Sequence, residues 1–157
     1  MATFFLHGLD SSGRGTKGCY FSAHFPRIVC PDFSGDLANR LQQFSTISAQ
    51  HQSLTLIGSS FGGLMATVFA IAHPERVRKL ILLAPALNFD GYAAPQTMVN
   101  TPTLVIIGKQ DIVTPPAVVL PLARKTFANL KEHLVEDDHL LHNTYSTLPW
   151  HELLADC

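Results

Sequence analysis

Charged residues are scarce in this chain, and their scarcity excludes several classes of protein. Only 15% of the 157 residues are Asp, Glu, Lys or Arg, and the formal net charge is −1. The eleven Lys and Arg residues are scattered, the densest group being Arg76, Arg78 and Lys79. A nucleic-acid-binding surface needs a cluster of basic residues, so the sequence argues against a nucleic-acid partner.

Cysteine is also rare, and long hydrophobic runs are missing. Cys19, Cys30 and Cys157 are far apart and form no C-x-x-C pair, so neither a disulfide framework nor a zinc site is predicted. No run reaches the roughly eighteen apolar residues of a membrane span. Only six residues precede His7, too few for a secretion signal. We therefore expect a cytoplasmic protein with no membrane partner.

Apolar residues are abundant and make up 46% of the chain. A chain of about 150 residues buries roughly 70% of the surface that it exposes when unfolded, so we expect a single domain over residues 1–157 with a substantial core. Short apolar runs predict six strands, and the segments between them have helical periodicity. The predicted strands are 2–6, 27–30, a run starting at 54, 79–84, 103–107 and 131–136, and the predicted helices are 14–24, 36–51, 64–72, one opening at 115 and one at 149.

This alternation of strands and helices is typical of βαβ units, which form parallel sheets. We predict an α/β fold with a doubly wound, mostly parallel six-stranded sheet in the order 2-1-3-4-5-6 and helices on both faces. Functional residues of such sheets gather at the carboxyl ends of the strands. Only residues 85–101 separate the fourth strand from the fifth, too few for a separate cap domain. Within them, Leu87, Phe89, Tyr92 and Met98 are expected either to line one wall of a site or to pack on the sheet.

Residues 58–62 read G-S-S-F-G, a G-x-S-x-G motif between a predicted strand and a predicted helix. This pattern indicates a nucleophile elbow, a tight turn that presents a serine at the end of a strand. The turn needs small residues two positions before and after the serine, because larger side chains would collide with it. Gly58 and Gly62 fill these positions around Ser60, whereas larger residues fill them around Ser59. The motif therefore predicts Ser60 as the nucleophile.

A serine nucleophile needs a base to take its proton and a third group to orient that base. Asp111 follows the fifth strand and His139 follows the sixth, and the order Ser60, Asp111, His139 is that of the α/β-hydrolases. Two alternatives stay open. Asp111 could merely cap the turn before Pro115, and His142 could be the base instead.

Several other polar residues are expected to have structural roles. Asp137 and Asp138 precede the predicted base and are expected to shape its loop. His133 lies inside the sixth strand, which does not suit a catalytic group. His7 precedes the nucleophile and is expected to make hydrogen bonds within its own loop.

Acyl transfer passes through an oxyanion, which two preorganised N–H donors stabilise. One donor is predicted to be the backbone N–H of Phe61, after the nucleophile, and the second that of Leu9, after the first strand. The Leu9 loop also has the spacing of a P-loop, but Arg14 replaces the phosphate-binding lysine and Gly15 the magnesium-binding hydroxyl. Nucleotide binding is therefore disfavoured. Arg14 and Lys17 are left as candidates to meet an anionic part of a substrate.

Together, residues 4–12, residues 57–63, the loop of Asp111 and His139 resemble the short bacterial α/β-hydrolase esterases of the YqiA type, in blocks that cover nearly the whole chain. The resemblance implies a minimal hydrolase without a lid that acts on acyl esters or thioesters. It implies Ser60, Asp111 and His139 as the triad. No metal or organic cofactor is expected, and the oligomeric state stays open.

Two other functions stay open as well. A hydrolase fold could serve as a catalytically idle binding module, which the filled triad positions disfavour. The same triad could also run a lyase or perhydrolase reaction, which the sequence does not separate from ester hydrolysis. The leading hypothesis is a serine esterase or thioesterase that acts on small acyl substrates through an acyl-enzyme.

Overall fold

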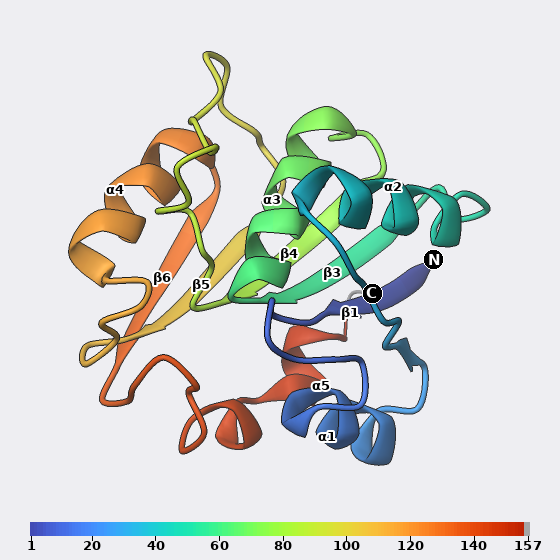
Figure 1. The fold of residues 1–157 in the computed structure, drawn as a ribbon, viewed down its shortest axis with the longest axis horizontal. Helices are drawn as coiled ribbons and strands as arrows, with labels where there is room; N and C mark the ends of the chain where they lie inside the picture. The colour runs from blue at the N-terminus through green and yellow to red at the C-terminus, as the bar shows by residue number, and fades with distance from the viewer. Residues whose placement is uncertain (156–157) are drawn as a thin grey trace.

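The computed structural model describes residues 1–155, so Cys157 and the last residues of the predicted tail lie outside the described part. Six strands form one sheet, in which each pair of neighbours is parallel. The order β2-β1-β3-β4-β5-β6 confirms the predicted topology (Figure 1). The strands are β1 (Ala2–Leu6), β2 (Ile28–Val29), β3 (Leu54–Ser59), β4 (Val77–Leu83), β5 (Thr103–Gly108) and β6 (Leu130–Val135).

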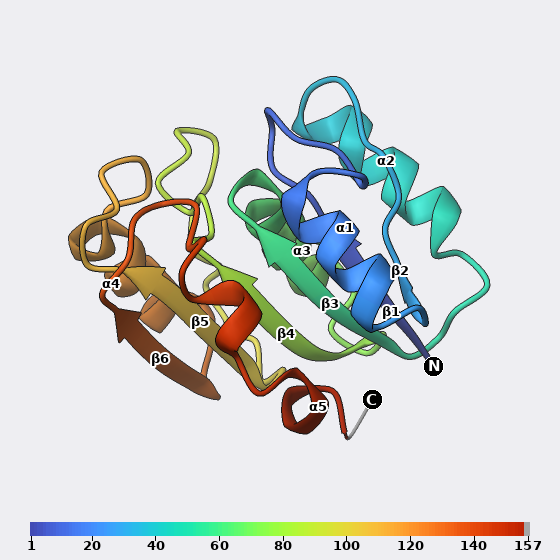
Figure 2. The ribbon, with the colours of Figure 1, turned by 90° about the horizontal axis from the view of Figure 1, so that it is seen from below.

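Helices cover both faces of the sheet, as Figures 1 and 2 show. One face carries α2 (Leu37–Ile47), α3 (Phe61–Ala72) and α4 (Pro116–Thr126), and the other carries α1 (Thr16–His24) and α5 (Trp150–Leu153), with the short 3-10 helix η1 (Tyr145–Thr147) before α5. The described segment between β4 and β5 contains no helix, so the fold has no cap domain. No helix within residues 1–155 is both long and apolar enough to cross a membrane.

Each face of the sheet has its own apolar core, because successive side chains of a strand point to opposite faces. Phe4 of β1 packs edge-on against Phe44 of α2, with ring centres 5.4 Å apart, in the core under α2, α3 and α4. Phe5 belongs to the second core, where Phe21 and Trp150 pack with ring centres 4.8 Å apart. Burial on both faces explains why the central strands read as continuous apolar runs.

Two helix boundaries differ from the prediction by three residues or more, for identifiable reasons. α3 begins at Phe61, earlier than expected, because the turn at Ser60 passes directly into the helix. α2 ends at Ile47, earlier than expected, and Ile47 itself is exposed. The chain turns away after the helix, where Arg76 Nη2 donates to the carbonyl oxygen of Ser48 at 2.7 Å. This contact satisfies a carbonyl that a longer helix would have bonded internally.

Candidate active site

Ser60 lies between β3 and α3 in a backbone conformation that side-chain-bearing residues rarely adopt. Its φ is 54° and its ψ is −114°, a combination that costs free energy and persists only where neighbours enforce it. The Ser60 N–H donates to the carbonyl of Leu83 at 2.9 Å, and its own carbonyl accepts from the N–H of Gly63 at 2.9 Å and of Ala86 at 3.0 Å. These bonds hold the serine side chain at the carboxyl end of the sheet.

The two glycines of the motif are required by close approach of the backbone. A Cβ atom on Gly58 would lie 2.5 Å from the carbonyl oxygen of Gly62, and one on Gly62 would lie 1.9 Å from the carbonyl oxygen of Leu6. From the motif we expect a larger side chain at these positions to collide with the serine, whereas in the structure it would collide with neighbouring backbone. Gly62 allows the start of α3 to lie directly against the end of β1.

We expect Gly62→Ala to destabilise the fold, because the added Cβ atom overlaps backbone that has no room to move. Overpacking costs about 1–3 kcal/mol in typical cores, and this contact belongs at the upper end. Urea titration measures the free energy of unfolding. Gly8→Ala is the matched control, since its Cβ atom would meet its nearest neighbours at 3.6 Å, an ordinary contact. Equal stability of the two variants would contradict the argument.

The structure brings together the three predicted triad residues from distant parts of the chain. Ser60 Oγ lies 2.9 Å from Nε2 of His139, and His139 Nδ1 lies 2.8 Å from Oδ2 of Asp111. The Asp111 side chain is fully buried, whereas that of His139 is 18% exposed. Because a carboxylate can only accept, Nδ1 carries the proton, and Nε2 is left to accept from the serine hydroxyl.

Asp111 both caps the turn and contacts the histidine, so the two roles considered for it are compatible. Its Oδ1 accepts from the N–H of Val113 at 2.9 Å and of Thr114 at 2.7 Å. These two bonds fix the rotation of the carboxylate. The second oxygen, Oδ2, is thereby held towards His139.

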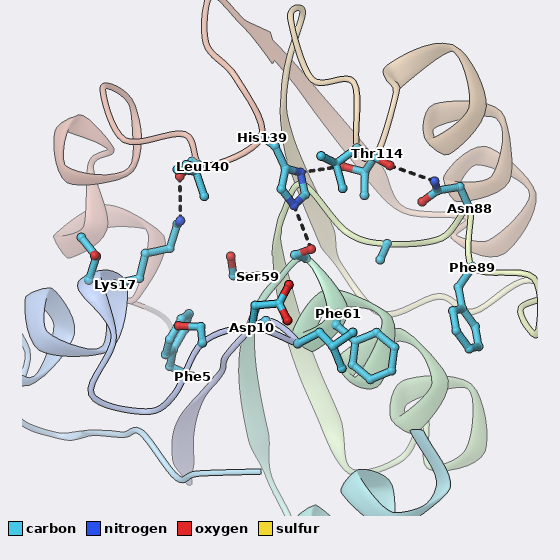
Figure 3. A pocket seen from close by; sticks show the side chains of 17 residues that line it. Phe5, Asp10, Lys17, Ser59, Phe61, Asn88, Phe89, Thr114, His139 and Leu140 are labelled. Atoms are coloured by element: carbon cyan, nitrogen blue, oxygen red, sulfur yellow. Dashed lines mark hydrogen bonds between the residues drawn. The ribbon is translucent and has the colours of Figure 1, made fainter. Parts of the chain in front are cut away.

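Thr114 is a fourth member of this cluster, and the sequence analysis missed it. Its hydroxyl donates to Asp111 Oδ2 at 2.7 Å. The same hydroxyl lies 3.1 Å from His139 Nδ1, as Figure 3 shows by a dashed line between the two side chains. The Thr114 residue is buried. A signal was available, because a threonine that closely follows an aspartate often turns back to it in an Asx-type turn.

Asp137 shapes the loop that carries His139, as predicted. Its Oδ1 accepts from the N–H of Asp138 at 2.8 Å, and its Oδ2 accepts from the N–H of Asn143 at 3.1 Å and the hydroxyl of Thr144 at 2.7 Å. Burial alone would raise the pKa of Asp137, but these hydrogen bonds together with His142 outweigh it and lower the pKa. The carboxylate is therefore a fixed acceptor that closes the loop.

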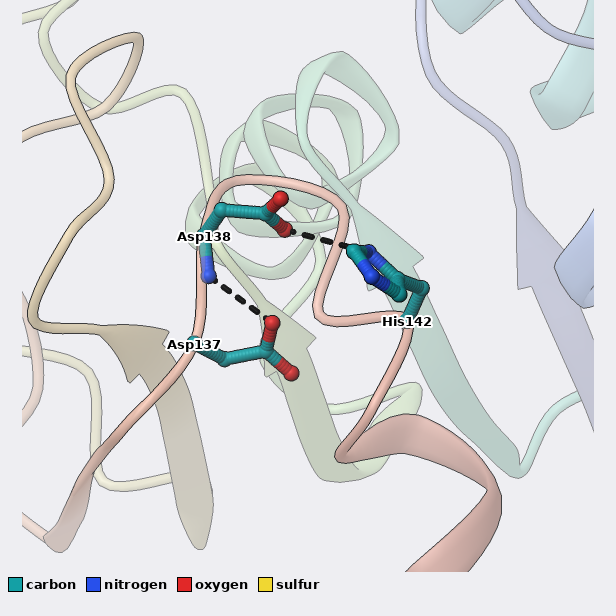
Figure 4. A group of neighbouring side chains, drawn as sticks. All are labelled: Asp137, Asp138 and His142. Carbon is teal, nitrogen blue, oxygen red and sulfur yellow. Dashed lines mark hydrogen bonds and ion pairs between the residues drawn. The ribbon is translucent and has the colours of Figure 1, made fainter.

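His142, the alternative base, lies away from the serine. Its Nδ1 is 3.4 Å from Oδ1 of Asp138 (Figure 4), and its side chain is 55% exposed. The contact with Ser60 is made by His139. Asp137, Asp138 and His142 bring their potential ligand atoms within 4.8 Å of one another. Hydrogen bonds within the loop already account for both carboxylates, so this cluster does not indicate a metal site.

His7 and His133 occupy structural positions, as predicted. His7 is buried, its Nδ1 donates to the carbonyl of Gly8 at 2.7 Å, and its Nε2 accepts from the N–H of Phe33 at 2.9 Å. The second bond reaches beyond its own loop and joins it to the segment after β2. Burial is the largest influence and lowers the pKa of His7, which favours the neutral ring that these two bonds require. His133 is exposed on the edge strand β6.

The backbone N–H groups of Leu9 and Phe61 are available at the serine. Phe61 is the first residue of α3, where N–H groups have no partner inside the helix. The loop that carries Leu9 stands beside the nucleophile, since a Cβ atom on Gly8 would lie 3.6 Å from Cβ of Ser60. Within residues 1–155, neither N–H donates to another protein group. No hydrogen bond within these residues therefore competes with the predicted role of the two N–H groups as oxyanion donors.

Arg40 of α2 lies close to both Leu9 and Phe61, and it was not predicted from the sequence. The residue is buried, and its Nε donates to the carbonyl of Gly35 at 2.8 Å. Its Nη2 lies 3.5 Å from the carbonyl oxygen of Leu9, and its Cζ lies 5.4 Å from the ring centre of Phe61. The available signal was position, because a residue four before Phe44 lies on the same face of the helix as Phe44, whose ring is buried in the core.

A cavity of about 520 Å³ opens in front of the serine (Figure 3). Its lining residues fall into an apolar group and a polar or charged group. The first group includes Leu9, Phe61, Ala86, Phe89, Val113 and Leu140, and the second includes Asp10, Ser11, Thr16, Lys17 and Asn88. Such a cavity suits a small molecule that has both an apolar and a polar part.

The segment between β4 and β5 contributes less to this cavity than the sequence suggested. Of the four candidate wall residues, only Phe89 is among those that line it. Leu87 is buried in the core, Tyr92 packs against the core and hydrogen-bonds Thr126, and Met98 is exposed elsewhere. Their apolar character is explained mostly by packing against the sheet.

Comparison with known proteins identifies the family of this chain. Residues 2–99, more than half of the chain, match the Hydrolase_4 family, which is described as serine aminopeptidase, S33. The chain belongs to this family of α/β-hydrolases. It is therefore a member of a serine-type hydrolase family.

Curated relatives match this chain over part of their length. The 2-hydroxy-6-oxononadienedioate/2-hydroxy-6-oxononatrienedioate hydrolase of Paraburkholderia phymatum is 32% identical over 107 residues, which are 68% of this chain and 32% of that protein. The putative protein-lysine deacylase ABHD14B of Rattus norvegicus is 31% identical over 80 residues, 51% of this chain and 34% of that protein. The homoserine O-acetyltransferase of Thermobifida fusca is 35% identical over 89 residues, 54% of this chain and 22% of that protein. The matches thus span about a third or less of each relative.

Solved structures share the fold at low sequence identity. The alpha/beta hydrolase domain-containing protein 10 from mouse has a TM-score of 0.78 and 18% identity, over 99% of this chain and 89% of that chain. A mutant of the meta-cleavage product hydrolase CumD has a TM-score of 0.76 and 15% identity, over 99% of this chain and 90% of that chain. At these identities the likeness shows the α/β-hydrolase fold alone.

Proposed function

We propose that this protein is a serine esterase or thioesterase that acts on small acyl substrates through an acyl-enzyme on Ser60. One observation carries the proposal, namely the line of contacts from Ser60 Oγ through His139 to Asp111, at 2.9 Å and 2.8 Å. Both distances are within hydrogen-bond reach, which proton transfer between a nucleophile and its base requires. The resemblance to the YqiA-type esterases agrees with this reaction.

In the proposed reaction, His139 Nε2 takes the proton of Ser60 as Oγ attacks the acyl carbonyl carbon. Asp111 stabilises the imidazolium that forms, and the N–H groups of Leu9 and Phe61 bind the oxyanion. The histidine then gives its proton to the departing alcohol or thiol. Water, deprotonated by the same histidine, attacks the acyl-enzyme, releases the acid and restores the serine.

Water is the favoured acceptor of the acyl group because the cavity has no cap over it. Two of the curated relatives are named as a putative deacylase and an O-acetyltransferase, so the names of similar proteins include both removal and transfer of an acyl group. In this chain the described segment between β4 and β5 forms no helix that could exclude solvent. An acyl-enzyme in an open cavity is exposed to water, which favours hydrolysis over transfer.

We expect hydrolysis of p-nitrophenyl acetate and butyrate in true solution, because the cavity is open and needs no lid movement. Initial rates are measured with p-nitrophenyl esters of increasing chain length, each below and above its solubility limit. The rates should vary smoothly across that limit. A sharp rise above it would contradict an open site. No hydrolysis of any ester would favour the idle binding module.

A further inference from the structure

Lys17 brings a positive charge to the cavity in front of Ser60. Among the lining residues within the described chain, it is the only lysine or arginine. Its Nζ donates to the carbonyl of Leu140 at 2.6 Å (Figure 3) and lies 5.2 Å from the ring centre of Tyr145. The two contacts hold the ammonium group beside the residue that follows His139.

The charge of Lys17 has no direct partner of opposite sign in the part of the chain that the structure describes. Within residues 1–155 its ammonium forms no ion pair with a carboxylate. Burial lowers the pKa of Lys17, and the more distant charges of Asp137 and Asp138 raise it by less. The protein groups around Lys17 therefore offset only part of the cost of burying its charge. An anion that enters the cavity would supply the missing compensation.

We propose that Lys17 binds a carboxylate group of the substrate, so that the natural substrates of the proposed esterase are acidic esters. The proposal rests on the esterase function and names its substrate class. An ammonium group has three N–H donors, and Leu140 uses one of them, which leaves two for a carboxylate. Ser11 and Thr16 line the same cavity and add hydroxyl donors. The apolar lining around Phe61 and Phe89 receives the rest of the substrate.

The other charged residues near the cavity refine this assignment. Asp10 also lines the cavity, and in the view of Figure 3 its carboxylate lies between Lys17 and Phe61. It repels an anion from the middle of the cavity, so a substrate carboxylate is favoured only at the end that Lys17 occupies. Arg14 is exposed and is not among the lining residues, so the proposal does not include it.

The test compares acidic esters with their neutral counterparts. One pair is mono-4-nitrophenyl glutarate and its methyl ester, with the carboxylate on the acyl part, and the other is 4-acetoxybenzoate and its methyl ester, with the carboxylate on the departing part. Lys17→Gln keeps a donor for Leu140 but removes the charge. In at least one pair it should lower kcat/KM for the acid on the order of 10- to 100-fold, the usual range for a charged hydrogen bond, with little change for the neutral ester. Lys17→Arg should retain the preference for the acid.

The control variant is Lys131→Met, which removes an exposed lysine on β6 that does not line the cavity. It should leave both esters of each pair unchanged. Equal loss for acid and neutral ester in Lys17→Gln would overturn the proposal, because Lys17 would then act only by holding the loop through Leu140. An unchanged ratio in both pairs would overturn it as well.

Binding tests the same contact without catalysis. In the Ser60→Ala background, calorimetry with 4-acetoxybenzoate and mono-4-nitrophenyl glutarate should give weaker affinity for at least one acid when Lys17→Gln is added, while the methyl esters bind alike. Equal affinities for both acids would overturn the carboxylate contact even if ester hydrolysis is confirmed. A loss of acid affinity would support the contact even if native protein hydrolyses no ester, which would count against the esterase function alone.

Discussion

Ser60→Ala is expected to abolish labelling by a fluorophosphonate probe and to remove nearly all esterase activity. Loss of the serine in a comparable triad lowers kcat by about 10⁴- to 10⁶-fold, because the remaining groups cannot form an acyl-enzyme. The structural reason is specific, since Ser60 Oγ is the hydroxyl that lies 2.9 Å from His139 Nε2. Labelling is measured by mass spectrometry, and kcat/KM with p-nitrophenyl butyrate.

Ser59→Ala is the matched control for this experiment. Ser59 is the neighbouring serine, lines the same cavity and carries the same reactive group. It is the last residue of β3, and among the described residues the serine that contacts the base is Ser60. The control should be labelled like native protein. Labelling that survives Ser60→Ala would contradict the proposed triad. If the native protein is not labelled, the catalytically idle binding module is favoured.

The topology and the elbow could be predicted because each depends on local pattern. Continuous apolar runs such as β5 indicate strands that are buried on both faces, and their alternation with helices leaves few parallel arrangements. Gly58 and Gly62 could be recognised because the backbone of so tight a turn leaves no room for a Cβ atom at these two positions. Asp111 and His139 could be found because they directly follow predicted strands, whose carboxyl ends meet at one edge of the sheet.

The residues that prediction missed are those whose environment depends on tertiary contacts. Thr114 and Arg40 are polar, and the local signals at these positions, an Asx-type turn and a place one helical turn from Phe44, do not by themselves show that a polar residue will be buried. Thr114 reaches Asp111 within one local turn, but its approach to His139 and the approach of Arg40 to the carbonyl of Leu9 span 25 and 31 residues of sequence, so only the folded chain brings these groups near. The same limit applies to Lys17, whose contact with Leu140 spans 123 residues of sequence.

The cluster around Asp111 also explains how one carboxylate fixes the tautomer of the base. Among the described residues, four groups contact its two oxygens, namely the N–H groups of Val113 and Thr114, the Thr114 hydroxyl and His139 Nδ1. The first three hold the carboxylate in place without the histidine. A carboxylate held in this way stabilises the imidazolium without having to reorganise when the charge forms.

We expect Asp111→Asn to preserve the fold and to lower kcat by about 10³- to 10⁴-fold, as loss of the orienting carboxylate does in serine proteases. The amide oxygen can still accept from Val113 and Thr114, which keeps the turn closed. The amide nitrogen then faces His139 Nδ1 and donates to it, so the ring proton moves to Nε2 and the base can no longer accept from Ser60. Circular dichroism checks the fold, and kcat for p-nitrophenyl butyrate measures the loss.

Asp138→Asn is the control for this prediction. Asp138 belongs to the base loop, the loop that carries His139, but its side chain is 49% exposed and does not contact His139. Its Oδ1 accepts from the N–H of Leu140 at 3.1 Å, a bond that an amide oxygen can also make. The variant should therefore stay within a few-fold of native activity. If Asp111→Asn were near native while Asp138→Asn or Asp137→Asn lost activity, the orienting carboxylate would have to come from the base loop itself, and Asp111 would only cap its turn.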